Sequence, residues 1–244
     1  MFSNIRIVLV ETSHPGNIGA AARAMKNMNL NDLCLVSPTN YPHADAFARA
    51  AGANDVLNNA VVVDSLEDAI SDCTLVMGAS ARLRTLKWPQ YTPVEAAAVL
   101  KKASLTSPVA LVFGRERTGL SNDELQLCHY LVHIPSNEAF SSLNLAAAVQ
   151  VLAYELFQAL QQNEVRTEPV EEDEIPVSQA EMQRYFEHLQ DVLVKVDFLD
   201  PQHPKKLMRR LHRLYNRAQP NQKEINILRG ILSAVEKEIQ GRNS

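Results

Sequence analysis

Six short runs of apolar residues constrain the fold of this chain more than any other feature of its sequence. Each run is rich in valine, leucine or isoleucine and does not alternate with polar residues. Such runs are typical of strands buried on both faces of a parallel sheet, and helical stretches separate them here. We therefore predict an α/β fold with a mostly parallel sheet. The predicted strands are Ile5–Val10, Leu33–Val36, Val61–Val63, Thr74–Met77, Val109–Phe113 and Leu131–Ile134.

Helical segments lie between and after these strands. Ser121 followed by Glu124 is a capping box, which predicts that a helix begins at this point. The stretch after the last strand is rich in Ala, Leu, Val and Gln, and it predicts one long helix packed on the sheet. The predicted helices are Ile18–Met28, Ser65–Ile70, Pro93–Lys102, Asn122–Cys128 and Leu143–Gln161.

A change in composition after Gln162 divides the chain. We assign residues 1–163 to the α/β domain and residues 164–177, which are acidic and contain two prolines, to a linker. Residues 178–244 form a basic helical extension whose own core would be marginal at under ~70 residues, so we expect it to pack on the main domain or on a partner. Its predicted helices are Ser178–Val196, Pro204 to about Arg217, and Asn221–Ile239.

The composition excludes several classes of protein. No apolar run approaches the ~20 residues that a membrane-spanning helix needs. The first four residues lack the basic-then-apolar pattern of a signal peptide, so we expect a cytoplasmic protein. The three cysteines, Cys34, Cys73 and Cys128, are far apart and have no CxxC spacing. This pattern favours buried thiols over a disulfide framework or a zinc site, and we expect no metal.

The formal net charge of −4 is unevenly distributed. Residues 1–163 carry a net −3, residues 164–175 a net −5, and residues 176–244 a net +4. A basic tail on an acidic chain indicates an anionic partner.

Three junctions between a loop and a helix carry polar residues that are suited to ligand binding or catalysis. They are Thr12–Gly19, Gly114–Ser121 and Ser141–Ala146, and each follows a predicted strand. In an α/β sheet, such junctions lie at the carboxyl ends of the strands, where ligands bind. Three junctions carrying Arg, Glu, Asn and Ser therefore indicate a ligand-binding site.

The glycines of these junctions do not match the common nucleotide-binding motifs. Gly114 and Gly119 have the spacing of a phosphate-binding loop, but Leu120 stands where that loop requires lysine. His14 occupies the position of the first glycine of a dinucleotide fingerprint. ATPase and NAD-dependent functions are therefore disfavoured. What remains is a close backbone approach at glycines, suited to a ligand held by main-chain contacts.

Three segments, Asn17–Ala24, Leu111–Leu120 and Ser141–Ala146, resemble the three motifs of the SPOUT family of RNA 2'-O-methyltransferases. Ala79–Arg82 and the helical extension are also similar, and the chain looks most like the bacterial members that methylate cytidine and uridine in tRNA. The resemblance implies a trefoil knot in the C-terminal part of the α/β domain, a homodimer with an active site shared across subunits, and S-adenosylmethionine as cofactor. It also implies a tRNA substrate, methylated at a pyrimidine at position 32 of the anticodon loop. Methylation of ribosomal RNA and a non-catalytic RNA-binding module are the alternatives.

The resemblance also implies roles for individual residues. The catalytic set would comprise Arg23, Asn17 and Ser142, with Arg23 also contacting RNA. A guanidinium has a pKa above ~12 and holds its proton, so we expect Arg23 to bind phosphate and orient the ribose. The cofactor would be bound by Ala79, Ser80, Ala81, Gly114, Glu116, Ile134, Ser142 and Leu143.

Each of these residues also has an ordinary interpretation. Arg23 could be a solvated surface residue, and Glu116 could be an ion-paired loop residue instead of a partner for the cofactor's sulfonium. Ser142, Asn144 and Asn17 could each cap a helix. We interpret His14 as a polar turn residue and leave it out of the catalytic set.

The C-terminal extension carries a basic stripe, which we define as Lys206, Arg209, Arg210 and Arg213. Their spacing places them on one face of a helix, with Leu207, Leu211 and Leu214 on another. The chain has no acidic residue between Gln202 and Gln219 to pair with them. Contact with RNA phosphates explains the stripe. A solvated charged face and packing against a partner subunit are the alternatives.

Overall fold

The computed structural model describes residues 4–81, 89–161, 175–202 and 206–242. The chain forms two compact units, residues 1–167 and 168–244. Within the described ranges, no helix is long and apolar enough to cross a membrane.

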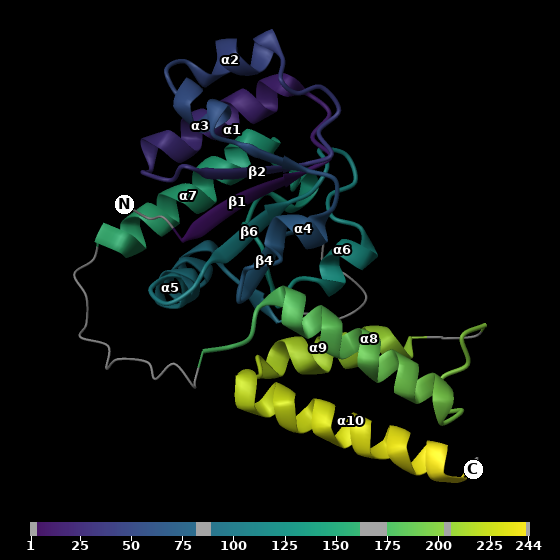
Figure 1. The fold of residues 1–244 in the computed structure, drawn as a ribbon. Helices are drawn as coiled ribbons and strands as arrows, with labels where there is room; N and C mark the ends of the chain where they lie inside the picture. Colours follow the sequence, from purple (N-terminus) through teal and green to yellow (C-terminus); the bar gives the residue numbers. More distant parts are fainter. Residues whose placement is uncertain (1–3, 82–88, 162–174, 203–205, 243–244) are drawn as a thin grey trace. The chain divides into compact units, whose positions relative to one another are not determined.

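The first unit contains a seven-stranded sheet with the order β3-β2-β1-β6-β4-β7-β5, in which every neighbouring pair is parallel (Figure 1). This confirms the predicted parallel α/β fold. The strands are β1 Ile5–Val10, β2 Asp32–Val36, β3 Val61–Val63, β4 Leu75–Ala79, β5 Gln90–Tyr91, β6 Val109–Phe113 and β7 Tyr130–Val132.

Helices cover both faces of this sheet, and the central strands alternate between the two cores. Ile7 and Leu9 of β1 pack with α1, α2, α3, α5 and α7, whereas Val8 and Val10 pack with α4 and α6. This alternation explains why the strand sequences are apolar at every position. The helices are α1 Pro15–Asn27, α2 Ala44–Ala50, α3 Asn54–Asn58, α4 Leu66–Ile70, α5 Pro93–Ser104, α6 Asn122–Gln126 and α7 Leu145–Gln161, with the 3₁₀ turn η1 at Glu138–Phe140.

The structure corrects the sequence prediction at β3. Val61 and Val62 are 54% and 51% exposed, because β3 is an edge strand that pairs with β2 on one side. The prediction that this strand is buried on both faces is therefore wrong. The short elements β5, α2 and α3 were not predicted, since two to seven residues carry too little periodicity to distinguish a helix or strand from a loop.

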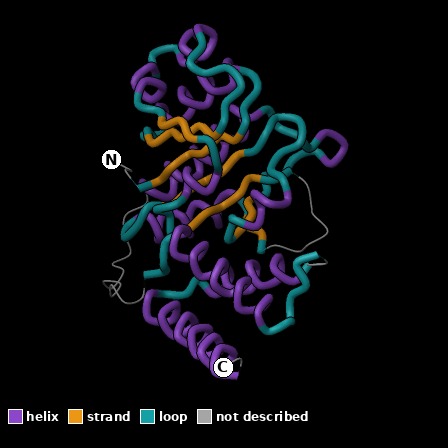
Figure 2. The backbone as a smooth tube through the Cα atoms, turned by 45° about the vertical axis from the view of Figure 1, so that its right-hand side comes forward, coloured by secondary structure: helices purple, strands orange, loops and turns teal. Residues whose placement is uncertain are grey.

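The second unit consists of α8 Gln179–Lys195, α9 Leu207–Ala218 and α10 Gln222–Arg242, as Figures 1 and 2 show. These helices correspond to the three that the sequence predicts. Val177, Met182 and Leu189 are among the residues of its core, and the ring of His212 stacks on Phe186.

One detail of α9 differs from the prediction. Leu211 and Tyr215 pack against the core of the unit, but Leu214 is 46% exposed, so it does not belong to the apolar face of the helix. The expected linker, residues 164–177, and the expected boundary at residue 163 fall mainly in 162–174, outside the described residues, and stay predictions.

A glycine sets the distance between α1 and α2. A Cβ atom at Gly19 would overlap the backbone carbonyl of Ala46, so the two helices approach at this point closer than any side chain allows. This contact sets the position of α2 against α1, and α1 begins at one of the three junctions.

We expect Gly19→Ala to lower the free energy of unfolding by about 1–3 kcal/mol, because the backbone of α2 must move to admit the methyl group. Gly230→Ala in α10 is the matched control. A Cβ at Gly230 meets nothing within 4 Å, so this change should stabilise the protein by about 0.4–1 kcal/mol through the unfolded chain. Urea titrations of both variants test the pair, and an equal effect of the two substitutions would contradict the role of Gly19.

Candidate functional site

A cavity lies at the carboxyl ends of the central strands and is built by loops that are far apart in the sequence. Its volume is about 240 Å³, the size of a small organic molecule and not of a single water. All eight residues that the sequence predicts for the cofactor lie in its wall. The lining residues are Ala79, Ser80, Ala81, Phe113, Gly114, Arg115, Glu116, Arg117, Thr118, Gly119, Leu120, Val132, Ile134, Ser141, Ser142, Leu143, Leu145 and Ala148.

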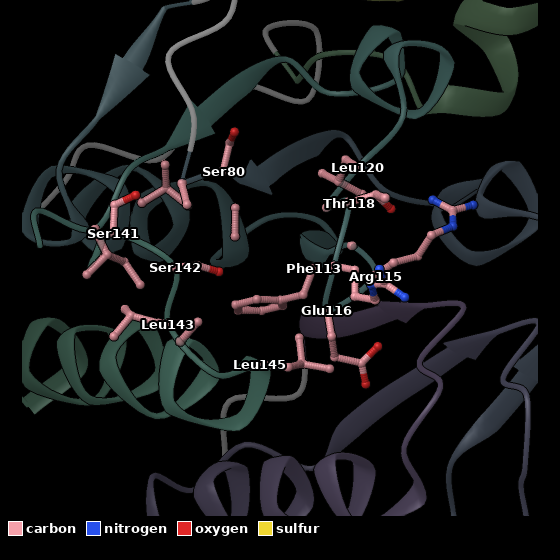
Figure 3. A pocket seen from close by; sticks show the side chains of 18 residues that line it. Ser80, Phe113, Arg115, Glu116, Thr118, Leu120, Ser141, Ser142, Leu143 and Leu145 are labelled. Atoms are coloured by element: carbon pink, nitrogen blue, oxygen red, sulfur yellow. The ribbon is translucent and has the colours of Figure 1, made fainter. Parts of the chain in front are cut away.

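Side chains from separate segments surround the hollow in Figure 3. Ser80 follows β4, Phe113 ends β6, and Ser142 precedes α7, with its hydroxyl directed toward the hollow. Small and apolar residues dominate the rest of the wall. The polar side chains of the wall come from Ser80, the Arg115–Thr118 segment and the two serines before α7, and the small residues leave the backbone at the strand ends accessible to a ligand.

Gly114 and Gly119 allow the second junction to fold back on itself. The Gly119 backbone N–H donates to the Arg115 carbonyl over 2.9 Å, and Gly119 has a φ of 68°. A Cβ at Gly114 would overlap the backbone of Gly119 and Leu120. The glycine at position 114 is therefore required by the loop itself, in addition to any contact with a ligand.

Arg115 fastens this loop to its surroundings. Its guanidinium donates to Glu124, which opens α6, over 3.0 Å and also pairs with Glu11 at the end of β1. The hydrogen bond from Arg115 lowers the pKa of the Glu11 carboxyl. These contacts assign Arg115 to the support of the loop.

Glu116 connects the second junction to the first. Its carboxylate accepts hydrogen bonds from the Ser13 backbone N–H at 3.2 Å and hydroxyl at 3.0 Å, from the His14 N–H at 3.3 Å, and from Asn17 Nδ2 at 3.0 Å. Burial raises the pKa of the Glu116 carboxyl, but the hydrogen bonds from Asn17 and the two backbone groups outweigh it and lower the pKa overall. The carboxylate stays ionised and is turned toward the start of α1, away from Ser80 and Ser142 (Figure 3).

Asn17 and Asn144 extend this network to the third junction. Asn144 Nδ2 donates to Asn17 Oδ1 over 3.0 Å, and Asn144 Oδ1 accepts from the Ala146 backbone N–H over 2.9 Å. Asn144 thus caps the start of α7 while it holds Asn17. The cap of α1 is His14, whose Nδ1 accepts from the Gly16 N–H over 3.0 Å, so Asn17 is free of the capping role that the sequence allowed for it.

Sequence reasoning placed Asn144 only as a helix cap and missed its link to Asn17. The available signal was its position inside the third junction, where an amide can donate to one partner and accept from another.

Arg23 does not line the cavity of its own chain. It is exposed on α1, roughly one third of a turn around the helix from Asn17, and it is absent from the cavity wall. Its guanidinium makes no hydrogen bond or ion pair with any residue that the structure describes.

The basic stripe lies on α9 and at its start, in the second compact unit. Lys206 and Arg210 are exposed, whereas Arg209 and Arg213 are half-buried.

The described part of the chain contains no cluster of three or more His, Cys, Asp or Glu residues that could hold a metal ion. Cys34, Cys73 and Cys128 are buried as free thiols, and burial raises the pKa of Cys34 to about 11 and that of Cys73 and Cys128 to about 12.

The family model identifies the class of protein to which this fold and its three linked junctions belong. Residues 4–154 match the model of the SpoU rRNA Methylase family, and the chain belongs to this family. Residues 180–244 match a second family model, the C-terminal domain of the tRNA methyltransferase TrmJ.

Similar proteins extend over the whole chain. The tRNA (cytidine/uridine-2'-O-)-methyltransferase TrmJ of Citrobacter koseri is 50% identical over 99% of this chain and 100% of its own length. The TrmJ of Escherichia coli K12 is 49% identical over 100% of both. Among solved structures, TrmJ from Z. mobilis ZM4 is 36% identical with a TM-score of 0.83, covering 95% of this chain and 98% of its own.

Proposed function

We propose that the protein transfers a methyl group from S-adenosylmethionine to the ribose 2'-oxygen of a pyrimidine in tRNA, at position 32 of the anticodon loop. Relatives that match the chain from end to end carry names for tRNA cytidine and uridine 2'-O-methylation, and they support the reaction and the substrate class. The observation that carries the proposal is the hydrogen-bonded network from Glu116 through Asn17 to Asn144 beside the cavity.

The cavity wall fits the proposed cofactor. Ile134 and Leu143 offer apolar surface for an adenine ring, and the backbone at Ala79–Ala81 and Gly114 offers polar groups for the rest of the molecule. When bound, S-adenosylmethionine supplies a methyl group that its sulfonium already activates. The Glu116 carboxylate adds a negative charge near this wall, while its hydrogen bonds hold it at α1.

Within the proposed catalytic set, the structure supports different roles for the three residues. Both polar atoms of the Asn17 side chain are engaged, so Asn17 positions the start of α1. Ser142 is exposed and directed toward the hollow, where its hydroxyl can hydrogen-bond to a ribose (Figure 3). We assign Arg23 to binding the phosphate and ribose of the substrate, because a guanidinium is a poor base and a strong hydrogen-bond donor to anions. The transfer then depends mainly on positioning an oxygen in line with the donor methyl.

Because Arg23 lies outside the cavity of its own chain, we propose that it acts at the cavity of a second subunit in a cytoplasmic homodimer. We also propose that the C-terminal part of the α/β domain forms a trefoil knot, because the resemblance to the SPOUT family implies one. Ribosomal RNA remains the second candidate substrate, since the family model bears that name.

The substrate proposal predicts that the protein labels bulk tRNA from isotopically labelled S-adenosylmethionine. Nuclease mapping should place the label on the 2'-oxygen of a pyrimidine at position 32, because the relatives act on cytidine and uridine of tRNA. Ribosomal RNA assayed in parallel is the control. Label in ribosomal RNA alone would replace the proposed substrate with the second candidate.

For Arg23, we expect Arg23→Ala to reduce methyl transfer at least ~100-fold, because the substrate is no longer positioned. Affinity for S-adenosylmethionine, measured by calorimetry, should be unchanged. Arg23→Lys keeps the charge but not the planar fork, so it should recover activity only in part.

Mixing subunits tests whether the site is shared. Heterodimers of Arg23→Ala with Ser142→Ala contain one site in which both residues are intact, so mixing two weak variants should restore activity. Wild-type rates for Arg23→Ala alone, or no recovery on mixing, would remove Arg23 from a shared site.

The basic stripe should contribute to RNA affinity by neutralising phosphates. Replacing Lys206 and Arg210 with Ser should lower the slope of log affinity against log salt concentration by about 0.7–0.9 for each phosphate that is no longer neutralised. Replacing Arg229 and Lys237 of α10 with Ser removes the same charge from the same unit and serves as the control. Equal slopes for the two double variants would argue against a specific role, and dissociation of the dimer in sedimentation would indicate a structural one.

A further inference from the structure

An exposed aromatic residue directly precedes three residues of the cavity wall in the sequence. Phe140 ends the turn η1 and is 81% exposed, the highest value among the large apolar side chains of the described residues. A ring with this exposure keeps a large flat apolar face available to a partner.

The turn that carries Phe140 is held in place on both sides. Asn137 Oδ1 accepts from the Ala139 N–H over 3.0 Å, and the Asn137 carbonyl accepts from the Phe140 N–H over 2.9 Å. The Ser136 hydroxyl donates to the Ser141 carbonyl over 3.0 Å and closes the loop that contains η1. Phe140 is therefore presented on a defined backbone.

The position of Phe140 relates it to the cavity. Ser141, Ser142 and Leu143, which follow it directly, all line the wall, and so does Ile134 before the turn. Arg117, another residue of the wall, is exposed and makes no hydrogen bond or ion pair with the residues that the structure describes. A ribose that enters the cavity would leave its base beside the wall, where the segment Ser141–Leu143 follows Phe140 directly.

We propose that Phe140 stacks against the base of the nucleotide whose ribose is methylated. The inference rests on the proposed function and adds the element that holds the base. A 2'-oxygen reaches a donor methyl inside a cavity only when its nucleotide is turned out of the loop, and unstacked RNA bases are commonly bound on aromatic side chains. Stacking uses the face of the ring and accepts cytosine and uracil alike.

The surroundings of Phe140 favour a base over a protein partner. Ser136, Asn137, Glu138, Ser141 and Ser142 are polar, and Leu143, the other exposed large apolar residue of the segment at 38%, belongs to the cavity wall. A surface that binds another subunit is expected to show a contiguous apolar patch at its centre. An exposed aromatic ring beside a binding cavity is an arrangement that proteins use to stack the bases of single-stranded nucleic acid.

The test is a double-mutant cycle between the protein and the RNA. Wild type and Phe140→Leu are each assayed on an anticodon stem-loop that carries either uridine or 5,6-dihydrouridine at the methylated position. Dihydrouridine keeps the ribose and the size of the base but loses its flat aromatic face. We expect wild type to methylate uridine about 5- to 100-fold more efficiently than dihydrouridine, the range that stacking on an aromatic side chain supports. Phe140→Leu should be slow on uridine and should discriminate little between the two RNAs.

Two further variants complete the design. Phe140→Trp should retain the discrimination, since a larger aromatic face stacks at least as well. Leu105→Ala, an exposed apolar residue at the opposite end of α5 from the junctions, is the control and should behave as wild type. Melting temperature and affinity for S-adenosylmethionine should be unchanged in every variant.

The outcomes separate this inference from the proposed function. If wild type transfers no methyl group to either RNA, the proposed function fails and the inference fails with it. If wild type is active and Phe140→Leu discriminates as wild type does, the stacking role alone is overturned. Dissociation of Phe140→Leu into monomers in sedimentation would instead assign the ring to a subunit interface and would also overturn the role.

Discussion

The ionised carboxylate of Glu116 is the group on which the arrangement of the site depends. It is partly buried, which disfavours its charge, yet four hydrogen bonds from Ser13, His14 and Asn17 keep it ionised. Loss of these donors would leave a partly buried charge unpaired, which is unfavourable. The carboxylate and the start of α1 therefore fix one another, and neither can move without loss of the other.

The parallel sheet makes this contact possible. Ser13 and Glu116 are 103 positions apart in the sequence, and Asn17 and Asn144 are 127 apart, yet each pair is joined by a hydrogen bond. Parallel strands bring their carboxyl ends to one edge, so loops from distant parts of the chain meet there without long excursions. The order of the strands puts β1 beside β6, and the first and second junctions follow these two strands.

The sequence predicts the features of this structure that depend on local interactions, and it does not predict those that depend on the order of the strands. Continuous apolar runs identify β1, β2, β4, β6 and β7, because a strand that is buried on both faces is apolar at every position of its own sequence. The exposure of Val61 depends instead on β3 being the edge of the sheet, which is a property of strand order. Eight residues of the cavity wall were predicted through the family resemblance, but the partners of Glu116 were not. A glutamate between two arginines suggests ion pairing by its neighbours, whereas in the fold Arg115 pairs with Glu11 and Glu124.

The two arginines of the second junction have different roles. Arg115 is tied to carboxylates on either side and gives the loop its shape, while Arg117 stays exposed at the cavity wall. The same division separates Asn17, whose side chain is saturated by Glu116 and Asn144, from Arg23, which has no partner in the described part of the chain. Groups that hold the cavity in shape have their hydrogen bonds satisfied within one subunit. Groups proposed to meet the substrate are left without partners, because a guanidinium already paired with a carboxylate would have to break that pair before it could bind a phosphate. A reaction governed by positioning requires residues whose hydrogen bonds are satisfied to hold the site rigid. It also requires a few polar groups without partners, fixed in position, to which the nucleotide binds.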